Sequence, residues 1–411
     1  MEGKPAGAMP ADARRWRVLA MLAACVILSM TTWFSATAVI PQLRAAWSLS
    51  DSIAAWMTIG VQVGFVIGAV GSSILGLSDV FAPKRVIIAG AVGAALANAA
   101  ILMFNDALAT VGLRIATGMF LALVYPPSLK LIATWFARGR GVALGVLVGA
   151  LTLGSAMPHL VNAVGGLRWQ VVISATTILT LVGAAMVQLF VHEGPYPFPR
   201  APFDPRRVTD ALKNRGIVYV SLGYFGHMWE LYAMWAWFLT YARLALQTQG
   251  AGGAAAASYL TFAVIGIGAL GCAAGGVMGD RLGRTFTTAL MMALSGSCAL
   301  LAGFVFNGPP WLFIAIALVW GFTVVADSAQ FSTMVTELGD PMYIGTALTL
   351  QLGLGFLLTV VTIWVLPLVA GRLGGWQWVF LVLLPGPALG AAAMLRLRGL
   401  PEARRIAGGR G

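Results

Sequence analysis

The chain has 411 residues, of which 59% are hydrophobic and 10% are charged, and this composition excludes an ordinary soluble globular protein. A net charge of +12 would suggest a nucleic-acid partner for a soluble protein, but membrane topology itself requires basic loops, so we expect no nucleic-acid partner. Cys25, Cys272 and Cys298 lie in apolar segments without metal-ligand spacing, so we expect no metal, no cofactor and no disulfide.

The hydrophobic residues come in blocks long enough to cross a bilayer, which predicts an all-α membrane protein with twelve transmembrane helices. The first block follows a basic segment but is too long for a signal-peptide core, so we expect it to be the first span. The expected spans cover residues 18–40, 53–76, 86–104, 108–136, 141–164, 170–192, 216–241, 258–279, 286–306, 311–336, 343–369 and 378–397.

Lysine and arginine are unevenly distributed between the two sides of these spans. On one side lie only Arg44, Arg168, Arg243 and Arg372, whereas most of the other basic residues share a side with both termini. Because basic loops stay in the cytoplasm, we expect a multi-pass protein of the inner (plasma) membrane with both termini cytoplasmic. We expect it to lie in the lipid bilayer as a monomer.

The longest break between spans, about residues 192–216, contains several prolines and divides the spans six and six. GVALGVLVG at 141–149 and GTALTLQLG at 345–353 resemble each other at a separation of about 205 residues. We therefore expect two pseudo-symmetric six-helix halves, at 1–192 and 216–411, joined by a cytoplasmic linker at 193–215.

Polar and charged side chains inside spans are costly in lipid and therefore mark candidate functional sites. In the first four spans the candidates for substrate binding are Trp33, Gln62, Arg114 and Tyr125. Arg114 could bind an anionic substrate group, pair with a carboxylate that carries a proton, or serve only as a structural arginine that extends to the membrane surface. Gln62 could line a cavity or bond between helices.

The seventh span contains the sequence GYFGHMWELYAMWAW at 223–237, in which His227 and Glu230 are three residues apart and share a helix face. A carboxylate and a histidine inside a membrane can exchange protons, although a neutral packing pair is the alternative. We expect Glu230 to be the main proton-coupling residue. His227 and Trp229 are also candidates for substrate binding, because aromatic side chains there could line a pocket for a planar or cationic ligand.

The tenth and eleventh spans hold the remaining candidates. Asp327 and Gln330 share a face of the tenth span, and Gln351 lies in the eleventh. Asp327 is the second candidate for proton coupling, and the two glutamines are candidates for substrate binding, although single glutamines often bond between helices instead.

The segment GGVMGDRLGR at 275–284 joins the eighth and ninth spans and carries the most specific motif in the chain. Gly276, Asp280, Arg281, Gly283 and Arg284 fit the pattern G-x-x-x-D-R-x-G-R-R of the major facilitator superfamily of transporters, and Thr285 replaces its last basic residue. Arg114 and Gly118 fit the R-x-x-x-G pattern of that family's fourth span. The loop after the second span keeps Asp79 but lacks the glycine and the first arginine.

The resemblance, which covers nearly the whole chain, implies a secondary active transporter rather than an enzyme. It implies that Asp79 and the motif residues Gly276, Asp280, Arg281, Gly283 and Arg284 act in gating. We expect Arg281 or Arg284 to approach Glu337 at the inner end of the tenth span. We also expect Asp280 to lie near Gly141, at the start of the fifth span.

Three functions remain open from the sequence. The first is proton-coupled alternating-access transport of a small anion or organic acid, since the sequences of spans one and five resemble those of the nitrate, cyanate and oxalate transporter branches of the family. The second is proton-driven efflux of lipophilic or cationic compounds, which the aromatic seventh span favours. A polytopic membrane enzyme is more remote, because the three histidines are scattered and form no catalytic or metal-ligand motif.

Overall fold

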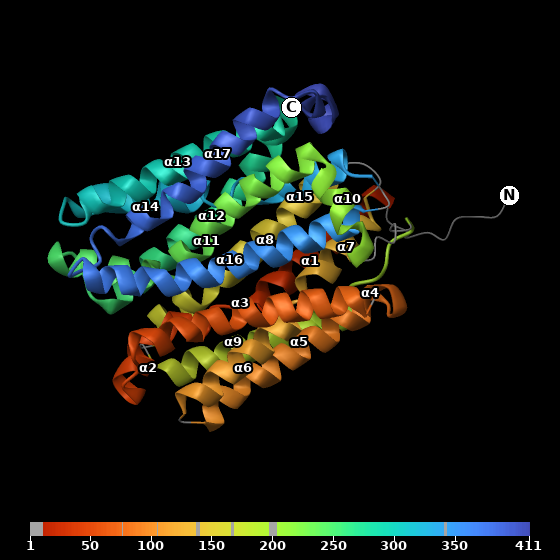
Figure 1. Cartoon of the computed structure of the whole chain (residues 1–411). Coiled ribbons are helices and arrows are strands. Elements are labelled where there is room, and N and C mark those ends of the chain that lie inside the picture. Colours follow the sequence, from red (N-terminus) through yellow and green to blue (C-terminus); the bar gives the residue numbers. More distant parts are fainter. Residues whose placement is uncertain are drawn as a thin grey trace.

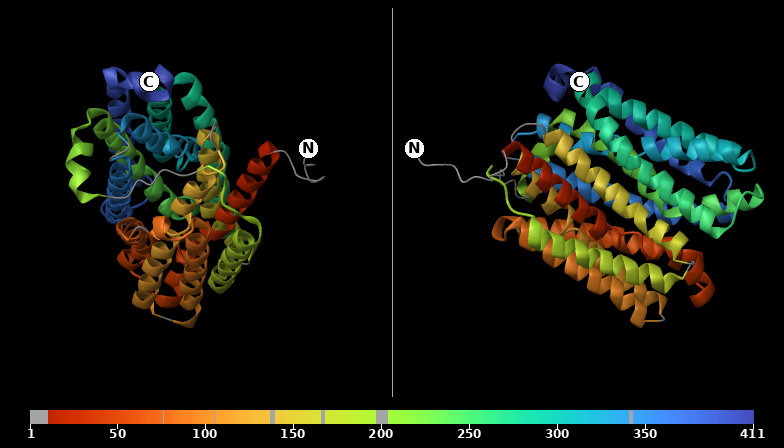
Figure 2. Two further views of the ribbon diagram at one scale, coloured as in Figure 1. Left: turned by 90° about the vertical axis from the view of Figure 1, so that its right-hand side faces the viewer. Right: turned by 180° about the vertical axis from the view of Figure 1, so that it is seen from behind.

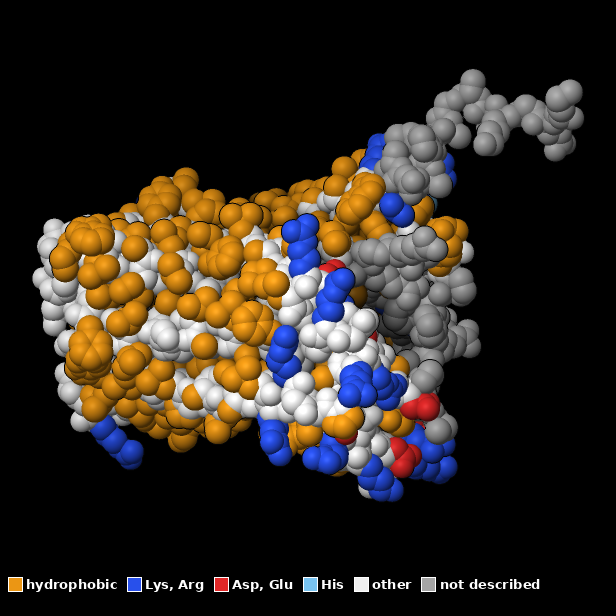
Figure 3. Space-filling view, turned by 90° about the horizontal axis from the view of Figure 1, so that it is seen from above, with side chains coloured by type: hydrophobic (Ala, Val, Ile, Leu, Met, Phe, Trp, Pro, Cys, Tyr) orange, Lys and Arg blue, Asp and Glu red, His pale blue; other side chains and the backbone are white. Residues whose placement is uncertain are grey.

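The computed structural model describes residues 11–75, 77–104, 106–136, 140–165, 168–196, 204–340 and 343–411, and in these ranges the chain forms helices and turns but no strand. The long helices lie side by side in one bundle, with α2 at one end and α10 at the other (Figure 1). Figure 3 shows hydrophobic side chains over most of one face and a concentration of Lys and Arg at the end that carries α10. We call this end the basic end and the opposite one the α2 end.

The N-terminal half is built from the elements up to residue 190. They are α1 (Ala11–Met30), η1 (Thr37–Val39), α2 (Ile40–Trp47), α3 (Asp51–Ile74), α4 (Leu77–Val80), α5 (Pro83–Ala100), η2 (Ile101–Met103), α6 (Ala107–Leu121), α7 (Tyr125–Ala133), α8 (Arg140–Val164) and α9 (Trp169–Phe190).

The remaining elements form the connection and the C-terminal half. They are η3 (Pro205–Arg207), α10 (Val208–Lys213), α11 (Arg215–Thr248), α12 (Ala254–Leu282), α13 (Arg284–Val305), α14 (Pro310–Thr323), α15 (Ser328–Leu338), α16 (Ile344–Arg372), η4 (Val379–Leu383), α17 (Pro385–Arg398) and η5 (Pro401–Gly409). Figure 2 shows both groups of helices from the basic end and from behind.

Ten helical stretches in the described residues are long and apolar enough to cross a membrane. The helices α1 and α11, of 20 and 34 residues, bring the number to the predicted twelve. The fold is therefore an all-α membrane protein, as the sequence predicts, and Cys25, Cys272 and Cys298 are buried and free.

Turns interrupt several predicted spans, among them the first, the fourth and the tenth, and the hydropathy pattern does not reveal these interruptions. The first ends its α-helix at Met30 and continues through turns at residues 31–36, the fourth turns at 122–124 and the tenth turns at 324–327. In the first span, hydroxyl groups compete for the backbone: Thr32 Oγ1 donates to Ser29 O at 3.1 Å, and Ser35 Oγ donates to Thr32 O at 3.1 Å. Apolar composition sets the length of a span, whereas such local hydrogen bonds decide where it is broken.

Glycines allow the closest helix contacts inside each half. A Cβ added at Gly64 of α3 would lie 1.9 Å from the carbonyl oxygen of Ile115 in α6. In the other half, a Cβ at Gly275 of α12 would lie 1.9 Å from the carbonyl oxygen of Ala326. These positions accept only glycine, because no side chain fits between the two backbones.

The two halves contact each other toward both ends of the bundle, along the helix pairs α8–α12 and α3–α16. Near the α2 end, Asn162 Nδ2 of α8 donates to Ser258 Oγ of α12 at 3.1 Å. Near the basic end, the hydroxyl oxygens of Ser73 in α3 and Thr349 in α16 are 3.4 Å apart. Residues between these contacts are therefore enclosed between the halves.

Candidate functional site

Six buried aromatic side chains meet where the two halves face each other, and we call them the aromatic cluster. They are Trp33, Phe34 and Phe65 from the N-terminal half, and Tyr232, Trp235 and Phe356 from the C-terminal half. Five ring pairs cross the boundary. The ring centroids are 5.9 Å apart in Trp33–Tyr232 and Trp33–Phe356, 6.4 Å in Phe34–Tyr232, 6.0 Å in Phe34–Trp235 and 4.6 Å in Phe65–Phe356. Pairs of this kind add to the energy of apolar burial and hold the halves together.

The break in the first span presents two consecutive side chains to the same partner. Trp33 and Phe34 both lie in the turns at 31–36, and the Tyr232 ring is stacked against both, at 5.9 and 6.4 Å. In a regular helix, consecutive side chains point about 100° apart around the axis. The break therefore places more aromatic surface at the boundary between the halves than a continuous helix would.

Several polar atoms at this place are buried without a hydrogen-bond partner among the described residues. They include both indole nitrogens, Trp33 Nε1 and Trp235 Nε1, and both side-chain amide atoms of Gln62. Gln62 lies on the same face of α3 as Thr58, which bonds to Thr37 of the first span at 2.7 Å, and as Phe65 of the aromatic cluster. Because buried polar groups are nearly always paired, this group of atoms has the properties of a site for a ligand with hydrogen-bonding groups.

Arg114 of α6 is fully buried and its guanidinium is engaged by backbone. It donates to Thr32 O at 2.8 Å, to Ser35 Oγ at 3.0 Å, to Met57 O at 3.1 Å and to the carbonyl oxygen of Trp33. The contacts with Thr32 O and Trp33 O satisfy carbonyls in the break, where regular helical partners are missing. Arg114 is therefore part of the structure that holds the break, while its predicted role in anion binding stays a prediction.

Glu230 lies inside the C-terminal half rather than opposite Arg114. Its two carboxylate oxygens accept hydrogen bonds from Ser295 Oγ of α13 and Trp320 Nε1 of α14, each at 2.7 Å. The sequence analysis does not single out Trp320, because a tryptophan in an apolar span carries no polar pattern that would mark it. The pairing with a carboxylate that the sequence analysis considers for Arg114 is absent from these contacts.

His227 and Asp327 form a second buried polar pair. His227 Nδ1 lies 2.9 Å from Asp327 Oδ1, and both side chains are almost inaccessible. Asp327 occupies the turn between α14 and α15, so the interruption of the tenth span brings its carboxylate to α11. His227 therefore contacts Asp327, although the sequence analysis expects it to share a proton with Glu230 on the next turn of its own helix.

The turn between α12 and α13 forms a network at the basic end, which we call the loop network. Arg284 binds both carboxylate oxygens of Glu337 at 3.0 to 3.1 Å, donates to Gln330 Oε1 at 2.7 Å and lies 3.1 Å from Asp280 Oδ1. The predicted contact between this loop and Glu337 is thus confirmed. Gly283 allows the turn, because its φ of 97° is unfavourable for any residue with a side chain.

The other predicted site residues lie in different surroundings. Trp229 Nε1 donates to Val382 O at 2.9 Å and Gln351 Nε2 to Ser221 Oγ at 3.4 Å, so both bond within the C-terminal half.

The remaining predicted residues make no such contact between helices with another described residue, or lie outside what the structure describes. Tyr125 begins α7 and is half-buried. Arg281 is exposed, and a Cβ at Gly276 would meet open space. The side chain of Asp79 and the surroundings of Gly141 lie outside the described residues, so the expected contact between Asp280 and the start of α8 stays a prediction.

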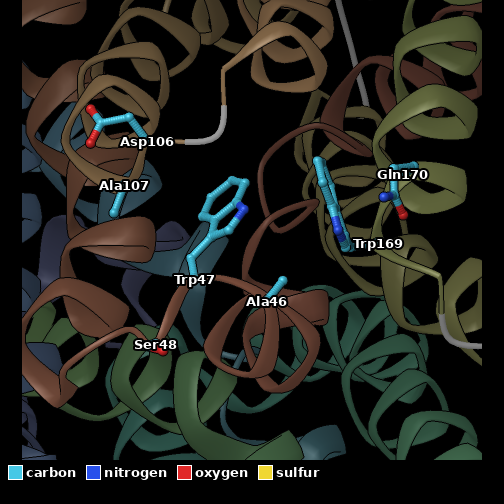
Figure 4. A pocket seen from close by; sticks show the side chains of 7 residues that line it. All are labelled: Ala46, Trp47, Ser48, Asp106, Ala107, Trp169 and Gln170. Atoms are coloured by element: carbon cyan, nitrogen blue, oxygen red, sulfur yellow. The ribbon is translucent and has the colours of Figure 1, made fainter.

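A cavity of about 690 Å³ lies at the α2 end and involves none of these residues. Figure 4 shows its lining, with Trp47 in view between Asp106 and Trp169. The two indole rings make an edge contact with centroids 5.4 Å apart, and Asp106 already caps α6 through a bond from Ala109 N. All the residues that line this cavity belong to the N-terminal half, so the cavity is not shared between the halves.

Comparisons with known proteins agree with this architecture. The sequence profile of the Major Facilitator Superfamily matches residues 22–362. The MFS transporter asaE of Aspergillus flavus is 26% identical over 309 residues, which span 72% of this chain and 66% of that protein. A probable actinorhodin transporter of Streptomyces coelicolor is 28% identical over 49% of this chain and 36% of its own length. The Agnestins efflux protein AgnL12 of Paecilomyces divaricatus is 27% identical over 26% of this chain and 25% of its own.

Two solved structures are similar over almost the whole length. The proton:xylose symporter XylE bound to 6-bromo-6-deoxy-D-glucose superimposes with a TM-score of 0.72 at 15% identity, covering 94% of this chain and 96% of its own. An inward-facing bacterial homologue of the human lysosomal transporter Spinster gives a TM-score of 0.68 at 14% identity, with 95% and 97% covered. At these identities the likeness concerns the fold.

Proposed function

This chain belongs to the major facilitator superfamily and is a membrane transporter, not an enzyme, and from that premise we propose that it exports a planar aromatic solute by proton-coupled alternating access. The solute carries carbonyl or hydroxyl oxygens and binds between the two halves at the aromatic cluster. The basic end faces the cytoplasm, because basic segments stay on that side of the membrane.

The observation that carries this proposal is the aromatic cluster together with its unpartnered polar atoms. Alternating access requires one site that both halves share, and the cluster takes three rings from each half. Flat rings stack well on a planar solute. The free indole N–H groups of Trp33 and Trp235 need acceptors, and the Gln62 amide offers both a donor and an acceptor.

Two buried acidic groups on or beside α11 support proton coupling. Glu230 and His227 belong to the helix that also carries Tyr232 and Trp235 of the aromatic cluster, and Asp327 contacts His227. Protonation or deprotonation of the Glu230 or Asp327 carboxylate alters how α11 packs against α13, α14 and α15. Such a change reaches the cluster through one rigid helix, which gives the linkage that coupled transport requires.

Transport of a small anion has less support from the contacts. An anion at Arg114 would have to displace the carbonyls of Thr32, Trp33 and Met57 from the guanidinium, and a buried carbonyl that loses a donor costs free energy. An uncharged aromatic solute needs no such displacement. The name of the Agnestins efflux protein supports the outward direction of transport, although that likeness covers a quarter of the chain.

A binding experiment separates these functions. The purified protein is heated with a dihydroxyanthraquinone, with anthracene as a planar hydrocarbon without oxygens, or with oxalate or nitrate, since a ligand that binds the folded state raises Tm. We expect the largest rise with the anthraquinone and none with the anions. A rise in Tm with the anions alone would overturn the proposal and support anion binding at Arg114.

Two variants of Trp33 test the site itself. Trp33→Phe keeps a ring but removes the indole donor, so we expect about tenfold weaker anthraquinone binding, the loss of about one hydrogen bond. Trp33→Ala should abolish the effect on Tm. Trp311→Phe is the matched control, because Trp311 is 69% exposed on the surface of the bundle. Unchanged binding in Trp33→Ala would exclude the aromatic cluster as the site.

A further inference from the structure

A second cavity, of about 420 Å³, lies at the basic end between the end of α17 and the segment that follows it. Three arginines line it, Arg398, Arg404 and Arg410, together with Gly399, Leu400, Pro401, Ala403, Gly409 and Gly411. No acidic side chain is among the described residues that line it. We call this cavity the arginine pocket.

The segment 401–411 is folded back onto the loop network by specific hydrogen bonds. Ala407 N donates to Glu337 Oε2 at 3.1 Å, Thr285 N donates to Gly411 O at 3.2 Å, and the Arg410 guanidinium donates to Asp280 O. The reversal requires left-handed backbone at consecutive residues, with φ of 49° at Ala407 and 64° at Gly408. The pocket is therefore a built structure rather than a loose tail.

The acidic groups that this segment contacts already have an arginine partner outside the pocket, whereas the arginines of the pocket form no ion pair with a described residue. Asp280 and Glu337 both pair with Arg284. Arg398 lies over the Phe286 ring at 5.4 Å, and Arg404 is exposed and forms no ion pair with a described residue. Three guanidinium groups around one cavity whose described lining has no acidic side chain favour an anion with several acceptor oxygens, such as a phosphate.

Apolar side chains beside the pocket distinguish a lipid from a free phosphate. Phe286, under Arg398, is 39% exposed, and Leu282 at the end of α12 is 48% exposed. Leu395, three residues before Arg398 and thus on the same face of α17, is 55% exposed. A molecule with a phosphate for the arginines and acyl chains for these side chains fits both parts of this surface.

We propose that the arginine pocket binds the phosphate of an anionic phospholipid in the membrane leaflet at the basic end. The bound headgroup fixes the segment 401–411 against Asp280 and Glu337 and so stabilises the loop network. Only the consequence for gating rests on the proposed transport function, and binding itself can be measured without it.

The test uses the purified protein in detergent and three probes: dihexanoyl phosphatidylglycerol, dihexanoyl phosphatidylcholine and inorganic phosphate. We expect phosphatidylglycerol to raise Tm in a saturable way and the other two to have no effect at the same concentration. An equal shift with inorganic phosphate would overturn the lipid assignment, and an equal shift with phosphatidylcholine would overturn recognition of the negative charge.

Variants locate the binding in the pocket. Arg398→Gln with Arg404→Gln should weaken phosphatidylglycerol binding at least tenfold. Arg396→Gln with Arg405→Gln removes the same amount of charge from α17 and the segment 401–411 at positions that do not line the pocket, and should keep wild-type affinity. Equal weakening in both would show a general effect of charge and overturn the proposal. Arg404→Gln alone serves if the first double variant does not fold, since Arg404 is exposed.

The gating consequence has its own readout. Transport of the aromatic solute is compared in proteoliposomes with and without phosphatidylglycerol, for wild type and for the pocket variant. We expect the lipid to change the transport rate of the wild type only. Loss of lipid binding with no change in transport would limit the proposal to binding, whereas absence of transport in every sample would count against the proposed function and not against the lipid site.

Discussion

Arg114 donates a hydrogen bond to the carbonyl oxygen of Trp33, and it donates to Thr32 O at 2.8 Å as well. The arginine thus fixes the backbone of the residue whose ring stacks on Tyr232 of the opposite half at 5.9 Å. A charged side chain inside the membrane here serves the geometry of a break in a helix. That relationship predicts how its variants behave.

Arg114→Gln should lower the free energy of unfolding strongly, since each buried carbonyl left without a donor costs about 1–3 kcal/mol. Arg114→Lys should restore only part of the lost free energy of unfolding, because one ammonium cannot reproduce the planar arrangement of guanidinium donors. Thermal unfolding in detergent measures both. Arg44→Lys is the control, since Arg44 makes only a surface pair with Asp51. Wild-type stability in Arg114→Gln would contradict the structural role.

Glu230→Gln should keep exchange of substrate across the membrane but lose accumulation driven by a pH gradient. Glutamine can still accept hydrogen bonds from Ser295 and Trp320, but it cannot release a proton. Proteoliposomes with and without a pH gradient measure the two activities. Ser295→Ala removes one partner and keeps the carboxylate, so it should keep coupling. If Glu230→Gln still concentrates substrate, Asp327→Asn becomes the next variant to test.

His227→Gln and Asp327→Asn should have effects on stability that are not additive. The two side chains lie 2.9 Å apart and are nearly inaccessible, so removal of one leaves the other buried without its partner. A double-mutant cycle on thermal stability should give a coupling energy of about 0.5–3 kcal/mol. Additivity within about 0.3 kcal/mol would mean that the pair contributes nothing.

Glu337→Gln should open the basic end more often, because it weakens the bidentate pair with Arg284. Cys272 of α12 faces Thr152 of α8, 4.0 Å away, and can report the opening. In a background with Cys25→Ser and Cys298→Ser, we expect faster maleimide labelling of Cys272 in Glu337→Gln than with Glu337 intact. Glu402→Gln provides the control at the same end of the molecule. An unchanged labelling rate would argue against a gating role for the pair.

Gly275→Ala and Gly276→Ala should differ although the two residues are neighbours. A Cβ at Gly275 would lie 1.9 Å from Ala326 O, whereas one at Gly276 meets nothing within 4 Å. We expect Gly275→Ala to destabilise the protein by about 1–3 kcal/mol through overpacking, and Gly276→Ala to be neutral or slightly stabilising in a helix. Equal melting temperatures for the two variants would contradict the packing of α12 against the tenth span.

The number of spans and their approximate bounds could be predicted because apolar composition over about 20 residues determines them. The contact of Arg284 with Glu337 could be predicted as well, because it joins a specific loop motif to an acidic residue at a predicted helix end. Both depend on information that is local in the sequence or carried by a strong motif.

The surroundings of the candidate site could not be predicted in the same way. Trp320 reaches Glu230 from another helix, and Arg114 reaches carbonyls of the first span, so both contacts depend on the tertiary packing. The sequence analysis considers a negatively charged partner for Arg114, because charges in lipid usually pair with charges, and leaves a structural role open beside it. Backbone carbonyls at a broken helix accept hydrogen bonds from an arginine equally well. Their presence cannot be read from the residue types in the sequence.

The support that Arg114 gives to the first span has a consequence for how substrate range can diversify. Three of its four hydrogen bonds end on main-chain oxygens, at positions 32, 33 and 57, and every residue type possesses that oxygen; the fourth ends on Ser35 Oγ. Side chains at 33 and 34 can therefore be exchanged without loss of the arginine's anchor. A combinatorial library at these two positions, selected against solutes of different size, should yield folded transporters with new preferences more readily than a library at position 114.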